Sequence, residues 1–140
     1  MRSKLIALFL LSTSTAFALS TGEWFEIPGG TWEPGSNVQS AAKVAIHGRL
    51  SKYLGPKNSL YKWERYSFQF QGVTSGHDVR MIHVVGFCVD LMEMFQTAFH
   101  TEFDYAHVWV LPGGGGPCFF RADFDPAKNQ VVTFQANASK

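Results

Sequence analysis

Alternation of apolar and polar residues in the second half of the chain is the feature that most limits its fold. Within residues 61–72, the run YSFQFQ places an aromatic side chain at every second position and a polar one between. This two-residue period is that of a β-strand with one buried face. Further runs rich in β-branched and aromatic residues predict four more strands, at 79–88, 104–111, 118–124 and 130–136.

One segment before these runs has a helical period instead. Small and apolar residues recur at helical spacing over residues 37–54, after a good N-cap at Ser36 or Asn37 and before Gly55-Pro56. Such a helix buries its apolar stripe only by lying across the sheet. The sequence therefore predicts an α+β fold, with one N-terminal helix packed on a curved antiparallel sheet of four to five strands.

The segment 89–103 interrupts the strands. Asp90 with Glu93 resembles an N-cap and N3 pair, and five apolar residues then follow at helical spacing: Leu91, Met94, Phe95, Ala98 and Phe99. We expect a short amphipathic helix or an ordered excursion. Two interpretations stay open, packing of this stripe against the core and an exposed, adaptable Met/Phe binding surface.

The N-terminus has the pattern of a secretory signal peptide. Arg2 and Lys4 precede the apolar run Leu5–Leu11, and Ala16-Phe17-Ala18 fits a cleavage site. The run is too short to span a bilayer, which takes ~20 residues, and no later apolar segment reaches that length. We expect cleavage after residue 18 and an exported chain, periplasmic or secreted.

The remaining chain is long enough for a single domain with a real core. We expect residues 19–35, rich in Gly, Pro and Trp, to form an arm, and residues 36–138 to form the domain. The full chain has 12 Lys and Arg against 11 Asp and Glu, two of the basic residues lying in the signal peptide. No basic block remains, so nucleic acid is not an expected partner.

The loop PGGGGP at 112–117 has three possible roles. A phosphate-binding loop needs Lys and Ser or Thr after its last glycine, and a dinucleotide loop needs a helix after it. A redox C-x-x-C pair is absent. Since strands are predicted on both sides, we expect a hairpin tip, in which glycine allows a tight reversal.

The two cysteines, Cys88 and Cys118, form an even count in an exported chain, which favours a disulfide. A plain meander of strands would place them at opposite ends of the sheet, while a bridge needs Cα atoms ~4.4–6.8 Å apart. Staggered strands, a return of the chain through 89–103, or two separate thiols would each remove this conflict.

Catalytic and metal-binding patterns are missing. The five histidines show no zinc-binding spacing, and no serine lies in a nucleophile elbow. We therefore expect no metal or cofactor and a non-enzymatic protein. The alternative is a small-molecule carrier or enzyme with a pocket between helix and sheet, in which His83 and His107 would be the polar groups.

The predicted order of elements from Ser36 to Phe124 resembles the cystatin-like α+β fold, or its NTF2-like relative. Cystatins carry Q-x-V-x-G in their first hairpin loop, where this chain reads QGVTSG from Gln71 to Gly76, with the final glycine one residue late. Their second loop usually carries Pro-Trp, and here Pro112 is followed by glycines. The resemblance implies binding through these loops.

A second resemblance covers Trp32 to Ala138, to small exported bacterial proteins of unknown function. It lies in five motifs: Trp32-Glu33-Pro34, Gln69-Phe70-Gln71-Gly72, Phe87-Cys88, Gly115-Gly116-Pro117-Cys118-Phe119-Phe120 and Phe124-Asp125. It implies a periplasmic or secreted domain.

We therefore expect an exported binding module for an exported protein partner, for example an inhibitor of a secreted or periplasmic hydrolase. Its binding edge would combine the arm at 22–32, the turn at 71–76 and the glycine loop. The candidate binding residues are Trp24, Gln71, Gly72, Val73, Gly113, Gly114 and Gly115.

Overall fold

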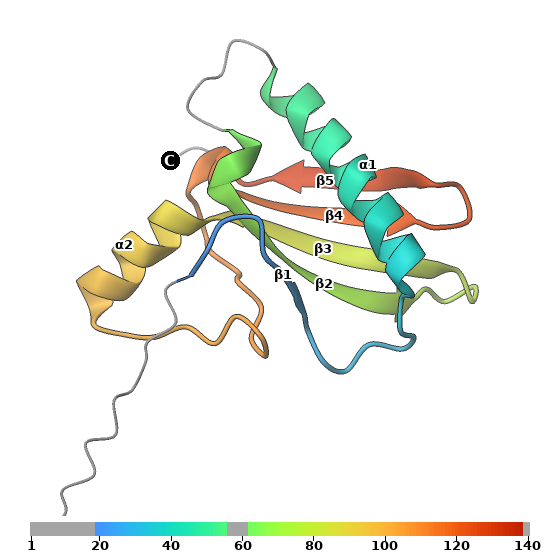
Figure 1. The fold of residues 1–140 in the computed structure, drawn as a ribbon, viewed down its shortest axis with the longest axis horizontal. Coiled ribbons are helices and arrows are strands. Elements are labelled where there is room, and N and C mark those ends of the chain that lie inside the picture. Colours follow the sequence, from blue (N-terminus) through green and yellow to red (C-terminus); the bar gives the residue numbers. More distant parts are fainter. Residues whose placement is uncertain (1–18, 56–61, 139–140) are drawn as a thin grey trace, which may run out of the picture.

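The structure, a computed structural model, describes residues 19–55 and 62–138, so the predicted signal peptide lies outside it. It is an α+β fold with two α-helices and one open five-stranded sheet in the order β1-β2-β3-β4-β5 (Figure 1). The elements are β1 (Trp24–Glu26), α1 (Ser36–Leu54), β2 (Tyr66–Thr74), β3 (Arg80–Cys88), α2 (Val89–Phe99), β4 (Phe119–Asp125) and β5 (Gln130–Ala136), with 3₁₀ turns η1 (Trp63–Arg65) and η2 (Gly116–Cys118).

The sheet is mixed, which corrects the prediction of a purely antiparallel one. Strands β2 to β5 pair antiparallel, but β1 in the arm pairs parallel to β2, with Trp24 opposite Phe68. Only three residues of the arm pair in this way. A strand this short leaves no readable period in the sequence.

Helix α1 confirms the predicted helix over 37–54 and covers one face of the sheet (Figure 1). Its buried residues Ala42, Ile46 and Leu50 lie in one core cluster with the aromatic side chains of the strands. Gly86 in β3 lets this core close, because an added Cβ would lie 2.1 Å from the ring of Phe120. Burial of a large apolar side chain contributes roughly 1.5–3 kcal/mol.

The predicted strand at 104–111 is wrong. This segment has no strand structure, and β3 pairs directly with β4. It instead lies over the sheet face opposite α1, held by the buried side chain of Gln69. The Nε2 of Gln69 donates to the carbonyl oxygens of Tyr105 (2.8 Å) and Val108 (2.6 Å), and its Oε1 accepts from the N–H of Val110 (2.7 Å). The burial of this segment does not follow the alternation in the sequence, since Val110 is buried and Leu111 is exposed.

Direct pairing of β3 with β4 also removes the conflict over the cysteines. Phe87 pairs with Phe119, so Cys88 and Cys118 are neighbours at the same end of the sheet. They form a disulfide with a Cα separation of 5.0 Å, within the usual range. The glycine loop is then not a hairpin tip, because no strand precedes it.

Candidate functional site

Helix α2 leaves the body of the protein at the end of β3 and projects beyond the sheet (Figure 1). Its first turn is anchored, since Cys88 directly before it is in the disulfide and Val89 and Met92 are buried. These are the helix's two buried residues. Beyond Met92, α2 therefore contacts the rest of the protein along one side only.

The apolar stripe predicted in this segment lies along α2 and is largely open to solvent. Leu91 and Phe95 are half-buried and pack against the core, whereas Met94 is 56% and Phe99 72% exposed. Because residues three and four apart share one side of a helix, the five apolar residues form a continuous row. Each of the two open interpretations therefore describes part of the stripe, with packing at Leu91 and Phe95 and an exposed surface at Met94 and Phe99.

The far end of α2 is closed by local hydrogen bonds. His100 has a left-handed backbone (φ 49°), and the N–H of Thr101 donates to the carbonyl of Gln96 at 3.1 Å, as helix C-caps commonly do. The Oε1 of Gln96 then accepts from the N–H of Phe103 at 2.8 Å. These bonds set where the chain turns back, so the exposed row ends at a defined position.

The glycine loop lies beside the start of this row. A Cβ added to Gly115 would lie 3.4 Å from Leu91 and 2.4 Å from the ring of Phe119, and the φ of Gly115 is +87°. Larger residues are therefore disfavoured there. The Nδ2 of Asn137 donates to the carbonyls of Pro112 (2.9 Å) and Gly114 (3.0 Å), which holds the loop in place.

We call the exposed stripe and this loop together the α2 surface. It consists of Leu91, Met94, Phe95, Ala98, Phe99, Gly113, Gly114 and Gly115. Three of the predicted binding residues thus belong to it, Gly113, Gly114 and Gly115. Sequence reasoning found the stripe but left its exposure open.

The other predicted binding residues, Trp24, Gln71, Gly72 and Val73, belong to the arm or contact it. Trp24 stacks on Phe68 with ring centroids 4.4 Å apart, and the Nε2 of Gln71 donates to the carbonyl of Pro28 at 2.7 Å. A Cβ on Gly72 would lie 2.2 Å from the carbonyl oxygen of Trp32, whose Nε1 donates to the carbonyl of Val73 at 3.0 Å.

Gln71, Gly72 and Val73 lie in strand β2 and not in the turn that follows it. The turn is closed by a hydrogen bond between the N–H of Ser75 and the carbonyl of Val79. It joins β2 to β3 at one end, while the glycine loop is next to Cys118 at the other. The structure thus does not bring turn and glycine loop together in one binding edge.

An open groove of about 550 Å³ lies along the arm, lined by residues 26–33 together with Ala106 and His107. At its rim, the Nδ1 of His107 and the Oδ2 of Asp104 are 2.9 Å apart. The hydrogen bond from His107 lowers the pKa of Asp104, although this carboxylate is exposed. The groove is open to solvent, and none of the residues that line it is a serine or cysteine nucleophile.

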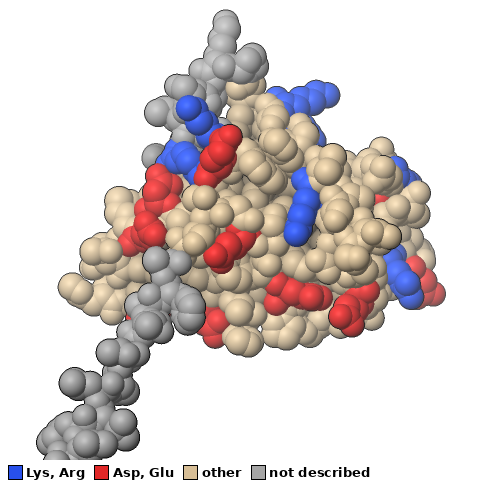
Figure 2. All heavy atoms as spheres, viewed as in Figure 1, with Lys and Arg blue, Asp and Glu red and all other residues tan. Residues whose placement is uncertain are grey.

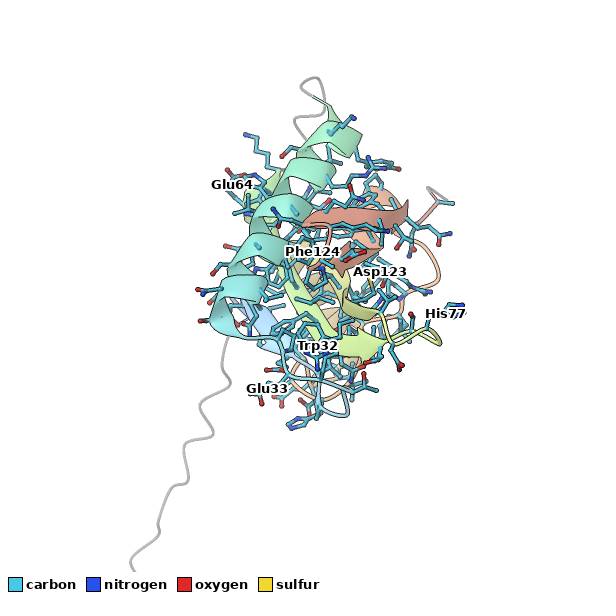
Figure 3. The ribbon with its side chains drawn as sticks, turned by 90° about the vertical axis from the view of Figure 1, so that its right-hand side faces the viewer. Trp32, Glu33, Glu64, His77, Asp123 and Phe124 are labelled. Atoms are coloured by element: carbon cyan, nitrogen blue, oxygen red, sulfur yellow. A yellow bond between two sulfur atoms is a disulfide. The ribbon has the colours of Figure 1, made fainter. Side chains whose placement is uncertain are left out.

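A histidine and a carboxylate meet on the sheet face away from α1. The Nδ1 of His83 on β3 is 2.8 Å from the Oδ1 of Asp123 on β4, and the Oγ1 of Thr133 on β5 donates to the other carboxylate oxygen at 2.5 Å. The hydrogen bond from His83 is the main cause that lowers the pKa of Asp123, and that from Thr133 adds to it, while burial opposes them. Figure 3 shows Asp123 farther from α1 than its neighbour Phe124.

Sequence reasoning missed Asp123 as the partner of His83, and Thr133 as a second partner of Asp123. The contact between His83 and Asp123 follows from the pairing of β3 with β4, which the wrongly predicted strand at 104–111 had hidden. His83 and His107 bind separate carboxylates, so the structure shows no shared site for them. Among the described residues, no three His, Cys, Asp or Glu side chains are grouped so that they would hold a metal ion.

One gap lies between α1 and the sheet. The gap lined by Trp24, Ala42, Lys43, Phe70 and their neighbours Gln39 and Ile82 has no room for a water molecule. Within the described part of the chain, no helix is long and apolar enough to cross a membrane.

Comparison of the chain with protein families, curated proteins and solved structures found no match. Its function is therefore argued from the geometry of the site.

Proposed function

We propose that this protein is an exported, non-enzymatic binding module that docks a partner protein through the α2 surface. The observation that carries the proposal is the exposure of Met94 and Phe99 on a helix whose two ends are fixed. Large apolar side chains grouped on the surface of a soluble domain mark interaction sites. Methionine also adapts well to a partner's shape because its side chain is flexible.

Export is part of the proposal and has two kinds of support. The disulfide between Cys88 and Cys118 is compatible with an oxidising compartment. The first 18 residues have the composition of a signal peptide.

A cystatin-like class is likewise proposed. It is supported by α1 followed by four consecutive antiparallel strands, with α2 between β3 and β4. Inhibition of a protease by the QGVTSG segment has little support, because Gln71 and Gly72 are covered by the arm.

The alternative of a small-molecule enzyme also has less support. The gap between helix and sheet that would hold the ligand is filled, and its two candidate histidines bind separate carboxylates.

Differential capture tests the proposal. The chain would be used as bait for exported proteins of its own organism, as wild type and as the double variant Met94→Ala/Phe99→Ala. The matched control is Val44→Ala, which removes a 75% exposed apolar side chain from α1. We expect one or more proteins to be retained by wild type and control and lost, by at least tenfold, with the double variant. Equal retention by all three baits would contradict docking through α2.

A further inference from the structure

The segment that carries the exposed stripe is strongly acidic. Residues 89–104 contain no lysine or arginine and four carboxylates: Asp90, Glu93, Glu102 and Asp104. The rest of the chain has 12 Lys and Arg against seven Asp and Glu, so the negative charge is concentrated in this segment. Figure 2 shows acidic side chains over α2. The α2 surface thus combines an apolar row with an excess of negative charge.

Only part of this charge is neutralised within the protein. Asp90 pairs with Arg65, and Asp104 pairs with His107. Glu93 and Glu102 make no ion pair with a described residue. Burial first, and then the negative charge of Glu93, raises the pKa of Tyr105 to about 12. The charge of Glu93 therefore reaches Tyr105, in the segment that follows α2.

Carboxylates lie near both ends of the stripe. On a helix, Asp90 neighbours both Glu93 and Met94, which lie three and four residues further on. Glu102 follows the helix end, close in sequence to Phe99. An approaching partner would therefore meet the apolar row and the negative charge together.

This arrangement disfavours two occupants. A second copy would bring like charges together across the contact, and like-charge contacts weaken binding by several kcal/mol. An anionic lipid surface would be repelled for the same reason, because lipid surfaces attract basic and not acidic segments.

We propose that the partner segment is a cationic amphipathic helix, with an apolar row that packs on Met94 and Phe99 and with Lys or Arg beside that row. This inference rests on the proposed function and names the partner class of the same surface. Amphipathic helices commonly dock their apolar side into such surfaces. An 11-residue helix such as α2 is about 16 Å long at 1.5 Å per residue, so two to three turns of the partner would cover it.

Three synthetic helical peptides with one shared leucine pattern test this, with polar positions all Lys, all Gln or all Glu. Binding is measured by fluorescence anisotropy at low and at physiological salt. We expect the Lys peptide to bind at least tenfold more tightly than the Glu peptide, with a smaller advantage at higher salt. The variant Glu93→Gln/Glu102→Gln should reduce this preference several-fold. The matched control Glu26→Gln/Glu33→Gln removes the same charge from the arm and should not.

The outcomes separate the two claims. Equal binding of all three peptides, lost with Phe99→Ala, would overturn the charge inference and leave docking through α2 intact. Binding that Phe99→Ala does not weaken would count against the docking surface itself. Preference for phosphatidylglycerol vesicles over all peptides would overturn the inference in favour of a membrane.

Discussion

The two helices have similar sequence patterns, but the apolar side of α1 is buried and that of α2 is partly exposed. In α1, Ala42, Ile46 and Leu50 are each at most 1% exposed, because the helix lies across the sheet. In α2 the apolar stripe is at least as regular, yet Met94 and Phe99 are mostly exposed because the helix lies beyond the sheet's end. A helical period in a sequence predicts a helix and its apolar side. It does not predict whether anything covers that side.

The largest effect is expected from the disulfide, which ties the start of α2 to the sheet. In the chain-entropy model, removing a bridge between cysteines 30 residues apart lowers the free energy of unfolding by about 4 kcal/mol. For Cys88→Ala/Cys118→Ala, urea unfolding should show a loss of this order. Hydrogen exchange should also speed up more in α2 than in α1. Unchanged protection of α2 would show that other contacts fix it.

A somewhat smaller effect separates the two helices directly. Ile46→Ala should lower the free energy of unfolding by about 3 kcal/mol, because it leaves a cavity under α1. Phe99→Ala removes a larger side chain but should cost less than about 0.5 kcal/mol, as at most exposed positions. Urea unfolding of both variants measures the difference. A loss with Phe99→Ala that approaches that of Ile46→Ala would mean that α2 packs like α1.

The smallest effect concerns charge. The pKa of Asp123 is lowered in the folded protein, chiefly by His83. A carboxylate whose folded pKa lies below its unfolded value of ~3.9 stabilises the fold above that value, and this is lost as pH falls through the folded pKa. The wild type should thus lose stability below about pH 4, and Asp123→Asn should lose less over that range.

The control for this charge effect is Asp104→Asn, which alters an exposed pair in the segment after α2. Urea unfolding between pH 3 and 7 should give it the pH dependence of wild type, because solvent screens exposed pairs. Identical curves for wild type and Asp123→Asn would show that the His83 pair does not stabilise the sheet.

Much of the fold follows from local patterns. The helix over 36–54 and the strands from β2 to β5 agree with the sequence to within a few residues, apart from the start of β2, because period and end signals are local. The segment 104–111 was misjudged for a physical reason. Its sequence alternates like that of a strand, but its backbone bonds to the side chain of Gln69 instead of a neighbouring strand. Hydrogen bonds between this segment and one distant glutamine side chain cannot be predicted from a local sequence pattern.

The candidate site was only partly predictable for a similar reason. The stripe on α2 could be read from its spacing, and the glycine loop from its composition. That Gly115 lies next to Leu91 depends on the disulfide and on the pairing of β3 with β4. The roles of Trp24, Gln71, Gly72 and Val73 in binding stay predictions, although each contacts the arm or belongs to it.

The most direct test of the central claim compares two methionines two residues apart on α2. Met94 is 56% exposed and Met92 7% exposed, and oxidation to the sulfoxide follows exposure. Mild peroxide treatment followed by peptide mass spectrometry measures both rates in one sample. We predict that Met94 is oxidised at least tenfold faster than Met92, at a rate close to that in unfolded chain. Equal protection of both methionines would contradict an open α2 surface.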